Sequence, residues 1–274
     1  MKIFIDSANI EEIEEAISWG IVDGVTTNPS LIKKAANYFI ERGKVISMEE
    51  YLKQLVKVSG PKRPVSLEVI HTDFEGIVSD AKKLFEKFNP VAQNVVIKVP
   101  VNPSVQKGGL NDFDGLKAIA VLSHEGIPVN ATLIMNPTQA ILAAKAGAFY
   151  VSPFAGRVDD YIRESAGIEF KKEDYYPEGG LEYEDSVLMD EGIVSGVHLV
   201  ETIKVIFEHY SLKAEVIAAS VRNVRQVYEL AETGTEIATI PFSVIKRMVV
   251  HEKTYEGMRN FVKDTIVDYS ELFK

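Results

Sequence analysis

Short apolar runs alternate with amphipathic stretches from one end of the chain to the other. Runs rich in β-branched residues predict strands, whereas apolar positions spaced roughly three or four residues apart predict helices. The predicted strands are residues 2–6, 21–26, 65–69, 93–100, 128–134, 148–153, 215–220 and 236–240. The predicted helices are residues 9–18, a segment beginning at Pro29, 48–58, 73–88, 112–123, 137–146, 223–232 and 242–250, with two terminal segments near 255–265 and 268–273.

This alternation predicts an α/β protein with a single (β/α)8 barrel domain, because eight strand–helix units in 274 residues are typical of that architecture. The main alternative is an open doubly wound sheet, but no Gly-x-Gly-x-x-Gly motif follows the first strand. Two insertions interrupt the pattern, near residues 101–114 after the fourth strand and 159–196 after the sixth. The second insertion is acidic and aromatic, and it is either a lid or a solvated excursion.

The composition is that of an ordinary soluble globular protein, with 46% hydrophobic and 26% charged residues. A net charge of −10 argues against a nucleic-acid partner. The chain has no cysteine, which excludes disulfides and thiolate chemistry. No apolar segment has the length of a signal peptide or a membrane span, so we expect a cytoplasmic protein without membrane contact. The five histidines lack metal-ligand spacing, and no metal site is predicted.

A lysine stands inside the fourth predicted strand, where the sequence reads Val95-Val96-Ile97-Lys98-Val99-Pro100. This run is typical of a strand buried on both faces, and a lysine there has no route to water. Two interpretations stay open at this point. Lys98 is either paired with a buried carboxylate, or it supplies a neutral amine in a dry place, which is the chemistry of a Schiff-base enzyme.

Polar residues recur at the ends of the other predicted strands. In a barrel, alternate strand residues face inward, and functional sites lie at the C-terminal ends of the strands. The residues of matching parity at these ends are Asp6, Thr26, Asn28, Ser66, Glu68, Asn130, Thr132, Ser152, Phe154, Ser220 and Arg222. A satisfied polar network filling the barrel would give the same pattern, but contributions from seven strands, with that of Lys98 included, favour a functional site. Thr27 has the opposite parity and is expected to support its turn.

Several of these strand ends belong to segments that resemble the transaldolase family. The matching segments are residues 4–9, 24–31, 68–69, 96–100, 130–133, 150–157, 219–223 and 239–242. Thr-Thr-Asn-Pro-Ser at 26–30 and Ser-Pro-Phe-Ala-Gly-Arg at 152–157 are highly specific. The resemblance extends over nearly the whole chain apart from the two insertions. It implies a (β/α)8 barrel that acts on sugar phosphates and needs neither a metal nor an organic cofactor.

The resemblance also implies a catalytic set of four residues. Lys98 would form a Schiff base with a ketose phosphate. Glu68 would act as the acid through a water held with Thr132, and Asp6 would take the proton from the hydroxyl beside the bond that breaks. The substrate-binding residues implied by the resemblance are Thr26, Asn28, Asn130, Ser152, Phe154, Arg157, Ser220 and Arg222. The two arginines would hold the phosphate, since guanidinium groups suit phosphate oxygens.

The family contains transaldolases and fructose-6-phosphate aldolases, which differ in the fate of the enamine. The aldolase subgroup typically has glutamine in place of Glu68 and tyrosine in place of Phe154, so this chain resembles the transaldolases. We therefore expect a dihydroxyacetone unit to pass from fructose 6-phosphate or sedoheptulose 7-phosphate to erythrose 4-phosphate or glyceraldehyde 3-phosphate, in the pentose phosphate pathway. The alternatives are a fructose-6-phosphate aldolase, another Schiff-base lyase, and a non-catalytic sugar-phosphate-binding barrel.

The resemblance finally implies a homo-oligomer. Compact members of the family form pentamers or decamers through a C-terminal helix that lies across a neighbouring subunit. The segment 255–273 has the helical pattern for this role. Packing of the same segment on its own barrel is the alternative.

Overall fold

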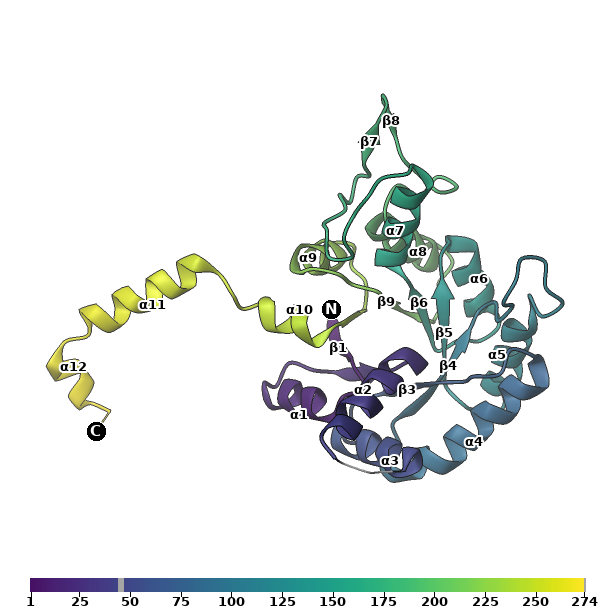
Figure 1. Ribbon diagram of the computed structural model, residues 1–274, viewed down its shortest axis with the longest axis horizontal. Coiled ribbons are helices and arrows are strands. Elements are labelled where there is room, and N and C mark those ends of the chain that lie inside the picture. The colour runs from purple at the N-terminus through teal and green to yellow at the C-terminus, as the bar shows by residue number, and fades with distance from the viewer. Residues whose placement is uncertain (44–46, 274) are drawn as a thin grey trace.

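The computed structural model describes residues 1–43 and 47–273 and contains a closed barrel of eight parallel strands (Figure 1). The strands follow one another around the barrel in the order β1-β10-β9-β6-β5-β4-β3-β2. They are β1 (Lys2–Asp6), β2 (Gly24–Thr26), β3 (Val65–Glu68), β4 (Val95–Pro100), β5 (Val129–Ile134), β6 (Tyr150–Pro153), β9 (Glu215–Ala218) and β10 (Ile237–Ile240). The predicted (β/α)8 barrel is therefore confirmed.

Helices surround the barrel and connect successive strands (Figure 1). They are α1 (Ile10–Ser18), α2 (Pro29–Glu41), α3 (Met48–Ser59), α4 (Phe74–Ala92), α5 (Asp114–His124), α6 (Pro137–Lys145), α7 (Ala155–Ser165), α8 (Gly196–His209), α9 (Val224–Glu232) and α10 (Phe242–Arg247). Many begin at a side chain that accepts a hydrogen bond from the first turn, namely Asn9, Asn28, Ser47, Asp73, Asn136, Ser195 and Asn223. Five of these caps follow barrel strands and fix where the strand-to-helix turn ends, namely Asn9, Asn28, Asp73, Asn136 and Asn223.

Several predicted boundaries are corrected by the structure. Helix α10 ends at Arg247 rather than at residue 250, and the first insertion ends before Asp114, which begins α5. Strand β2 begins at Gly24 rather than at residue 21, because its pairing with β1 starts at Gly24, opposite Phe4. Helix α4 continues through Pro90 to Ala92 and ends where Gln93 adopts a φ of 55°. The second insertion begins later than predicted, since residues 159–165 belong to α7, whose Val158 and Ile162 pack in the core. The remaining 166–195 carry a small hairpin, β7 (Glu182–Tyr183) and β8 (Ser186–Val187).

The hydrophobic core has two parts, because strand residues alternate between the barrel interior and the helical layer. The outer part lies between strands and helices and includes Ile97 and Val99 of β4. The inner part fills the barrel near the N-terminal ends of the strands, with Phe4, Val96, Tyr150, Ile217 and Ile237. Lys98 has the same parity as Val96, so it too faces the interior, one layer closer to the C-terminal ends.

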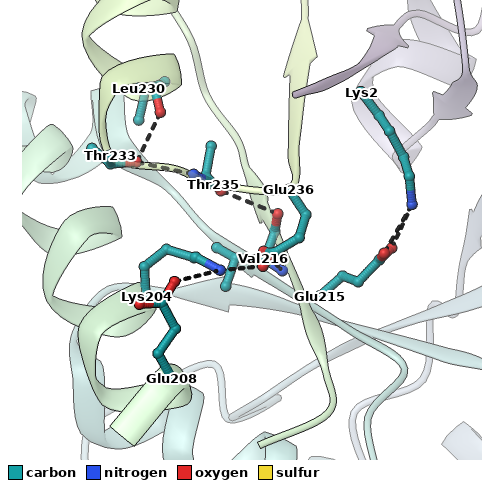
Figure 2. Close-up of polar contacts among 9 residues, drawn as sticks. All are labelled: Lys2, Lys204, Glu208, Glu215, Val216, Leu230, Thr233, Thr235 and Glu236. Atoms are coloured by element: carbon teal, nitrogen blue, oxygen red, sulfur yellow. Dashed lines mark hydrogen bonds and ion pairs between the residues drawn. The ribbon is translucent and has the colours of Figure 1, made fainter. Parts of the chain in front are cut away.

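Ion pairs and hydrogen bonds link the N-terminal ends of β1, β9 and β10 (Figure 2). The buried Lys204 of α8 contacts Glu236, which also accepts a hydrogen bond from the Val216 backbone nitrogen at 3.0 Å. The more exposed Lys2 pairs with Glu215 at 2.8 Å. These contacts tie the last two strands to the first, where the barrel closes.

The C-terminal segment leaves the barrel after α10 and extends into solvent as α11 (Glu252–Asp264) and α12 (Val267–Glu271) (Figure 1). No side chain of α11 is buried. The exposed apolar residues of this C-terminal arm are Tyr255, Met258, Phe261, Val262, Ile266, Tyr269, Leu272 and Phe273. Packing on its own barrel, one of the two sequence-based alternatives, is therefore wrong.

Among the described residues, none of the helices combines the length and apolarity needed to cross a bilayer.

We predict that Lys204→Met destabilises the fold more than Lys2→Met. Loss of the Lys204 ammonium leaves the Glu236 carboxylate without its cation in a half-buried position, which costs about 2 kcal/mol in the free energy of unfolding. The exposed Lys2–Glu215 pair contributes less than about 1 kcal/mol. Urea denaturation of both variants measures the difference. Equal losses for the two variants would contradict the ranking.

Candidate active site

Lys98 lies on the inward face of β4, and its ammonium is held by two oxygen atoms from neighbouring strands. Its Nζ is 3.4 Å from Oε2 of Glu68, and the two side chains are only 5% and 12% exposed. Glu68 and Lys98 are register partners on β3 and β4, which brings both onto the same face. The Nζ also donates to the Thr27 carbonyl at 3.3 Å. The Thr27 hydroxyl donates to the Ser66 carbonyl, so Thr27 supports its turn as predicted.

Asp6 ends β1 and is hydrogen-bonded within the barrel. The Thr26 hydroxyl donates to Asp6 Oδ1 at 2.7 Å and lies 2.5 Å from the Thr239 hydroxyl. Asp6 and Thr26 are register partners on β1 and β2, which explains why the contact forms. A row of strand-end side chains thus holds one oxygen of this carboxylate in place.

Burial raises the pKa of both carboxyl groups near the lysine. For Asp6, desolvation is the main cause, and the charge of Lys98 and the Thr26 hydrogen bond oppose it. For Glu68, desolvation again dominates over the lowering effect of Lys98. Each carboxylate is therefore a stronger base than it would be in water. Carboxyl groups tuned in this direction suit proton transfer near neutral pH.

Three polar residues from β5 and β6 lie at or beneath the floor of the site. The Ser152 hydroxyl donates to Asn130 Oδ1 at 2.7 Å, and Asn130 Nδ2 donates to the Ser66 hydroxyl at 3.2 Å. Thr132 is fully buried, and its hydroxyl has no hydrogen-bond partner among the described residues. Nearby, the Asn28 Oδ1 accepts from the Leu31 nitrogen at 2.9 Å as the N-cap of α2. This contact uses only the oxygen of the Asn28 amide.

The two arginines come from helix starts on adjacent sides of the barrel. Arg157 lies in the first turn of α7, and Arg222 precedes α9. The Arg222 Nη2 contacts Asp160 Oδ2 at 2.7 Å, and its backbone nitrogen donates to Gln226 Oε1 at 2.9 Å. The Arg222 Nε is buried without a hydrogen-bond partner among the described residues. A buried donor of this kind fits an anionic ligand.

Two backbone features make room for Arg222. Ser220 adopts a φ of 62°, which is uncommon for a residue other than glycine, and this conformation turns the chain after β9. A Cβ on Gly156 would lie 2.2 Å from the Ser220 carbonyl oxygen and 2.4 Å from Arg222 Nε. Glycine is therefore required at position 156, where α7 and the β9–α9 turn come closest.

A cavity of about 730 Å³ at the C-terminal end of the barrel brings these groups together. Of the site residues predicted from sequence, it is lined by Asp6, Thr26, Asn28, Glu68, Lys98, Ser152, Phe154, Arg157, Ser220 and Arg222. Asn130 and Thr132 are fully buried and are not part of its lining. Within the described residues, no group of three or more histidine, aspartate or glutamate side chains is arranged to hold a metal ion.

Several lining residues were missed by sequence reasoning. They are Lys34, Leu133, Lys172, Glu173, Thr239 and Ser243, among others. Thr239 stands at the end of the last barrel strand, so the parity rule that found Thr26 would also have found it. Leu133 has a φ of 58° beside an irregularity in the β5–β6 register, and no pattern in the sequence announces this. Lys172 belongs to an insertion without periodicity.

The protein is a (β/α)8 barrel with a polar cavity at the C-terminal ends of its strands. Enzymes with this fold have their active sites at this end of the barrel. The family model described as transaldolase/fructose-6-phosphate aldolase matches residues 3–272. Proteins named probable transaldolase are 40% identical over 265 residues in Aquifex aeolicus, 39% over 264 in Thermoplasma acidophilum, and 40% over 264 in Petrotoga mobilis. Each alignment covers 96% of this chain and 94–96% of the relative. The chain belongs to the transaldolase/fructose-6-phosphate aldolase family and is an enzyme of the transaldolase type.

We predict that Gly156→Ala weakens the binding of phosphate-bearing ligands. The added methyl group must displace the Ser220 carbonyl or the Arg222 side chain, and a shift of about 1 Å at a binding group can lower activity tenfold or more. The matched control is Gly179→Ala, where a Cβ meets nothing within 4 Å. Competition by inorganic phosphate measures the affinity. Unchanged affinity in Gly156→Ala would mean that Arg222 does not bind the anion.

Proposed function

We propose that this enzyme transfers a dihydroxyacetone unit between sugar phosphates through a Schiff base on Lys98. The observation that carries the proposal is a buried lysine amine in a polar cavity, 3.4 Å from the Glu68 carboxylate. A lysine that only balanced a buried charge would not need a cavity of about 730 Å³ beside it. A nucleophilic lysine needs both a base to deprotonate it and space for a carbonyl compound.

The first half of the reaction builds the iminium ion. The Lys98 ammonium gives a proton to Glu68, whose raised pKa favours acceptance, and the free amine attacks C2 of fructose 6-phosphate. The carbonyl oxygen takes up a proton from the attacking nitrogen, which gives a neutral carbinolamine with a hydroxyl group. Glu68 returns a proton to this hydroxyl, which leaves as water and generates the iminium. The unpartnered Thr132 hydroxyl would hold the water that connects Glu68 with the leaving oxygen.

The second half breaks and remakes a carbon–carbon bond. Asp6 takes the proton from the C4 hydroxyl, the bond between C3 and C4 breaks, and its electrons pass to the iminium. Glyceraldehyde 3-phosphate leaves, and the dihydroxyacetone enamine stays attached to Lys98. Erythrose 4-phosphate then accepts the enamine carbon at its aldehyde, and Asp6 returns the proton. Hydrolysis of the new iminium releases sedoheptulose 7-phosphate and restores the lysine.

The remaining site residues bind the substrate in this proposal. Arg157, Arg222 and Ser220 hold the phosphate, with Asp160 fixing the guanidinium of Arg222. The groups that orient the three-carbon unit are Thr26, Asn28, Asn130, Ser152 and Phe154. Phosphorylated sugars cannot cross a membrane unaided, so we assign the reaction to the cytoplasm. Because the proposed exchange interconverts three-, four-, six- and seven-carbon sugar phosphates, we assign it to the pentose phosphate pathway.

Transfer rather than simple aldol cleavage is favoured by two residues. Glu68 and Phe154 both line the cavity and match the transaldolases of the family rather than its aldolase subgroup. Phe154 packs near both cations, with its ring centroid 5.8 Å from Lys98 Nζ and 5.7 Å from Arg157 Cζ. The family description includes fructose-6-phosphate aldolases, so release of free dihydroxyacetone is the second candidate activity.

Borohydride reduction in the presence of fructose 6-phosphate, followed by mass mapping, tests the Schiff base. We expect an adduct on Lys98 alone, since among the lysines that the structure describes only Lys98 is both buried and part of the cavity wall. The variant Lys98→Met should form no adduct and show no turnover, while it keeps affinity for the ligand. An adduct elsewhere, or normal turnover in the variant, would overturn the mechanism.

Transfer and cleavage are distinguished by the acceptor. We expect glyceraldehyde 3-phosphate release from fructose 6-phosphate to depend on added erythrose 4-phosphate, because the enamine waits for a second aldehyde. A coupled dehydrogenase assay with and without the acceptor measures this dependence. Equal steady rates in both conditions, with free dihydroxyacetone accumulating, would assign the enzyme to the aldolase activity instead.

The pH dependence should report Asp6. Its carboxylate must be ionised to accept a proton, so kcat/KM falls as the pH drops through its pKa. Burial raises this pKa above the ordinary value of 3.8, so the loss of activity should begin above that pH. Asp6→Asn should lower the rate by about 10²–10⁴ while the borohydride adduct still forms. An acidic limb that persists in a residually active Asp6→Asn enzyme would assign it to another group.

We also propose that the enzyme is a homo-oligomer joined through its C-terminal arm. Tyr255, Met258 and Val262 lie on one face of α11 at helical spacing, and all three are exposed. An apolar face without contact to its own barrel is best satisfied on a second copy. Sedimentation of the full chain and of a chain ending at Lys253 tests this. A truncated chain that assembles like the full one would contradict the proposal.

A further inference from the structure

A closed β-turn in the second insertion reaches the catalytic cavity. The Asp174 backbone nitrogen donates to the Lys171 carbonyl at 2.9 Å, and the Lys171 nitrogen donates to Asp174 Oδ2 at 2.8 Å. Lys172 and Glu173 are thus the two central residues of a four-residue turn whose ends are joined twice. These two residues line the cavity, whereas Lys171 and Asp174 at the base of the turn do not.

The chain on both sides of this turn is attached to the barrel through aromatic side chains. Before the turn, the ring centroid of Phe170 lies 4.3 Å from the guanidinium carbon of the buried Arg163. After the turn, Tyr176 is only 4% exposed, and its ring centroid lies 5.2 Å from the same Arg163 carbon. Because Arg163 belongs to α7, this helix positions both the turn and Arg157.

A second attachment joins the turn to α9. The Tyr175 hydroxyl donates to Glu229 Oε1 at 2.6 Å, and the Arg225 guanidinium carbon lies 4.0 Å from the Tyr175 ring centroid. Glu229 is only 1% exposed, so the Tyr175 hydroxyl is bound to a buried carboxylate of α9. The turn is therefore a fixed wall of the cavity, held by the two helices that accompany Arg157 and Arg222.

The cation at the tip of the turn lines the same cavity as Asp6, Glu68 and Lys98. The positive charge of Lys172 acts with that of Lys98 to oppose the burial that raises the pKa of Asp6. Lys34 of α2 lines the same cavity. A neighbouring chamber of about 400 Å³ is also lined by both Lys34 and Asp6. Cations from α2 and from the insertion thus border the part of the cavity that adjoins Asp6.

We propose that Lys172 is a specificity-determining residue that binds the phosphate of the sugar-phosphate substrate together with Arg157 and Arg222. The inference rests on the proposed transaldolase function and adds to it a contact from the insertion. An ammonium group facing open cavity gains little from a neutral hydroxyl group, whereas a phosphate offers it a charged acceptor. The insertion then favours phosphorylated over unphosphorylated aldehydes as acceptors.

The test compares Lys172→Ala with Lys171→Ala, which removes the same charge from the neighbouring residue at the base of the turn. The readout is the ratio of kcat/KM for glyceraldehyde 3-phosphate to that for glyceraldehyde. We expect this ratio to fall about three- to fivefold in Lys172→Ala, as for one partly exposed ion pair, and to stay unchanged in Lys171→Ala. A second variant, Lys172→Glu, should lower the ratio further.

Equal ratios in both alanine variants and in the unmodified enzyme would overturn the role of Lys172. Calorimetric binding of fructose 6-phosphate separates this failure from failure of the proposed function, because it requires no turnover. If the enzyme forms no borohydride adduct, the proposed function fails, but weaker binding in Lys172→Ala alone would still support the contact. If the adduct forms and both variants bind fructose 6-phosphate equally, only the inference about Lys172 fails.

Discussion

Burial of charge inside a closed barrel is the constraint on which the rest of the structure depends. The interior of an eight-stranded barrel is just wide enough for side chains, so a lysine that points inward must find its partners there. Lys98 meets this requirement with the Glu68 carboxylate and the Thr27 carbonyl. The apolar layer below, built around Phe4, Val96 and Tyr150, closes the barrel and keeps the charged layer next to the cavity. The same partners that make the lysine tolerable also make it chemically useful.

The two sequence-based interpretations of Lys98 are therefore not exclusive in the structure. A salt bridge with Glu68 exists, as the structural interpretation required, and the pair faces a cavity, as the chemical one required. A buried pair of this kind contributes little net stability, because desolvation offsets the attraction. The N-terminal end of the barrel is organised differently. There Lys204, Glu236 and the Val216 backbone share contacts that serve the closure of the sheet.

The barrel and most of the site were predictable because both depend on strict alternation along short strands. The inward parity of Asp6, Glu68 and Lys98 follows from counting residues back from the strand ends. The boundaries in the second insertion were not predictable, since α7 has an arginine- and aspartate-rich sequence whose helical face becomes visible only when Val158 and Ile162 are buried. Positive φ angles at Leu133 and Ser220 likewise result from tertiary contacts rather than from residue preference.

The attachment of the second insertion affects which substitutions this fold can accept during evolution. Three aromatic rings beside the turn contact arginines on α7 and α9, namely those of Phe170, Tyr175 and Tyr176. Only the tip of the turn lines the cavity. Anchor and tip are separate in the sequence, so residues 172–173 can be exchanged without loosening the barrel. Acceptor preference could then drift by point substitution at a surface turn, while the buried lysine and its carboxylates stay untouched.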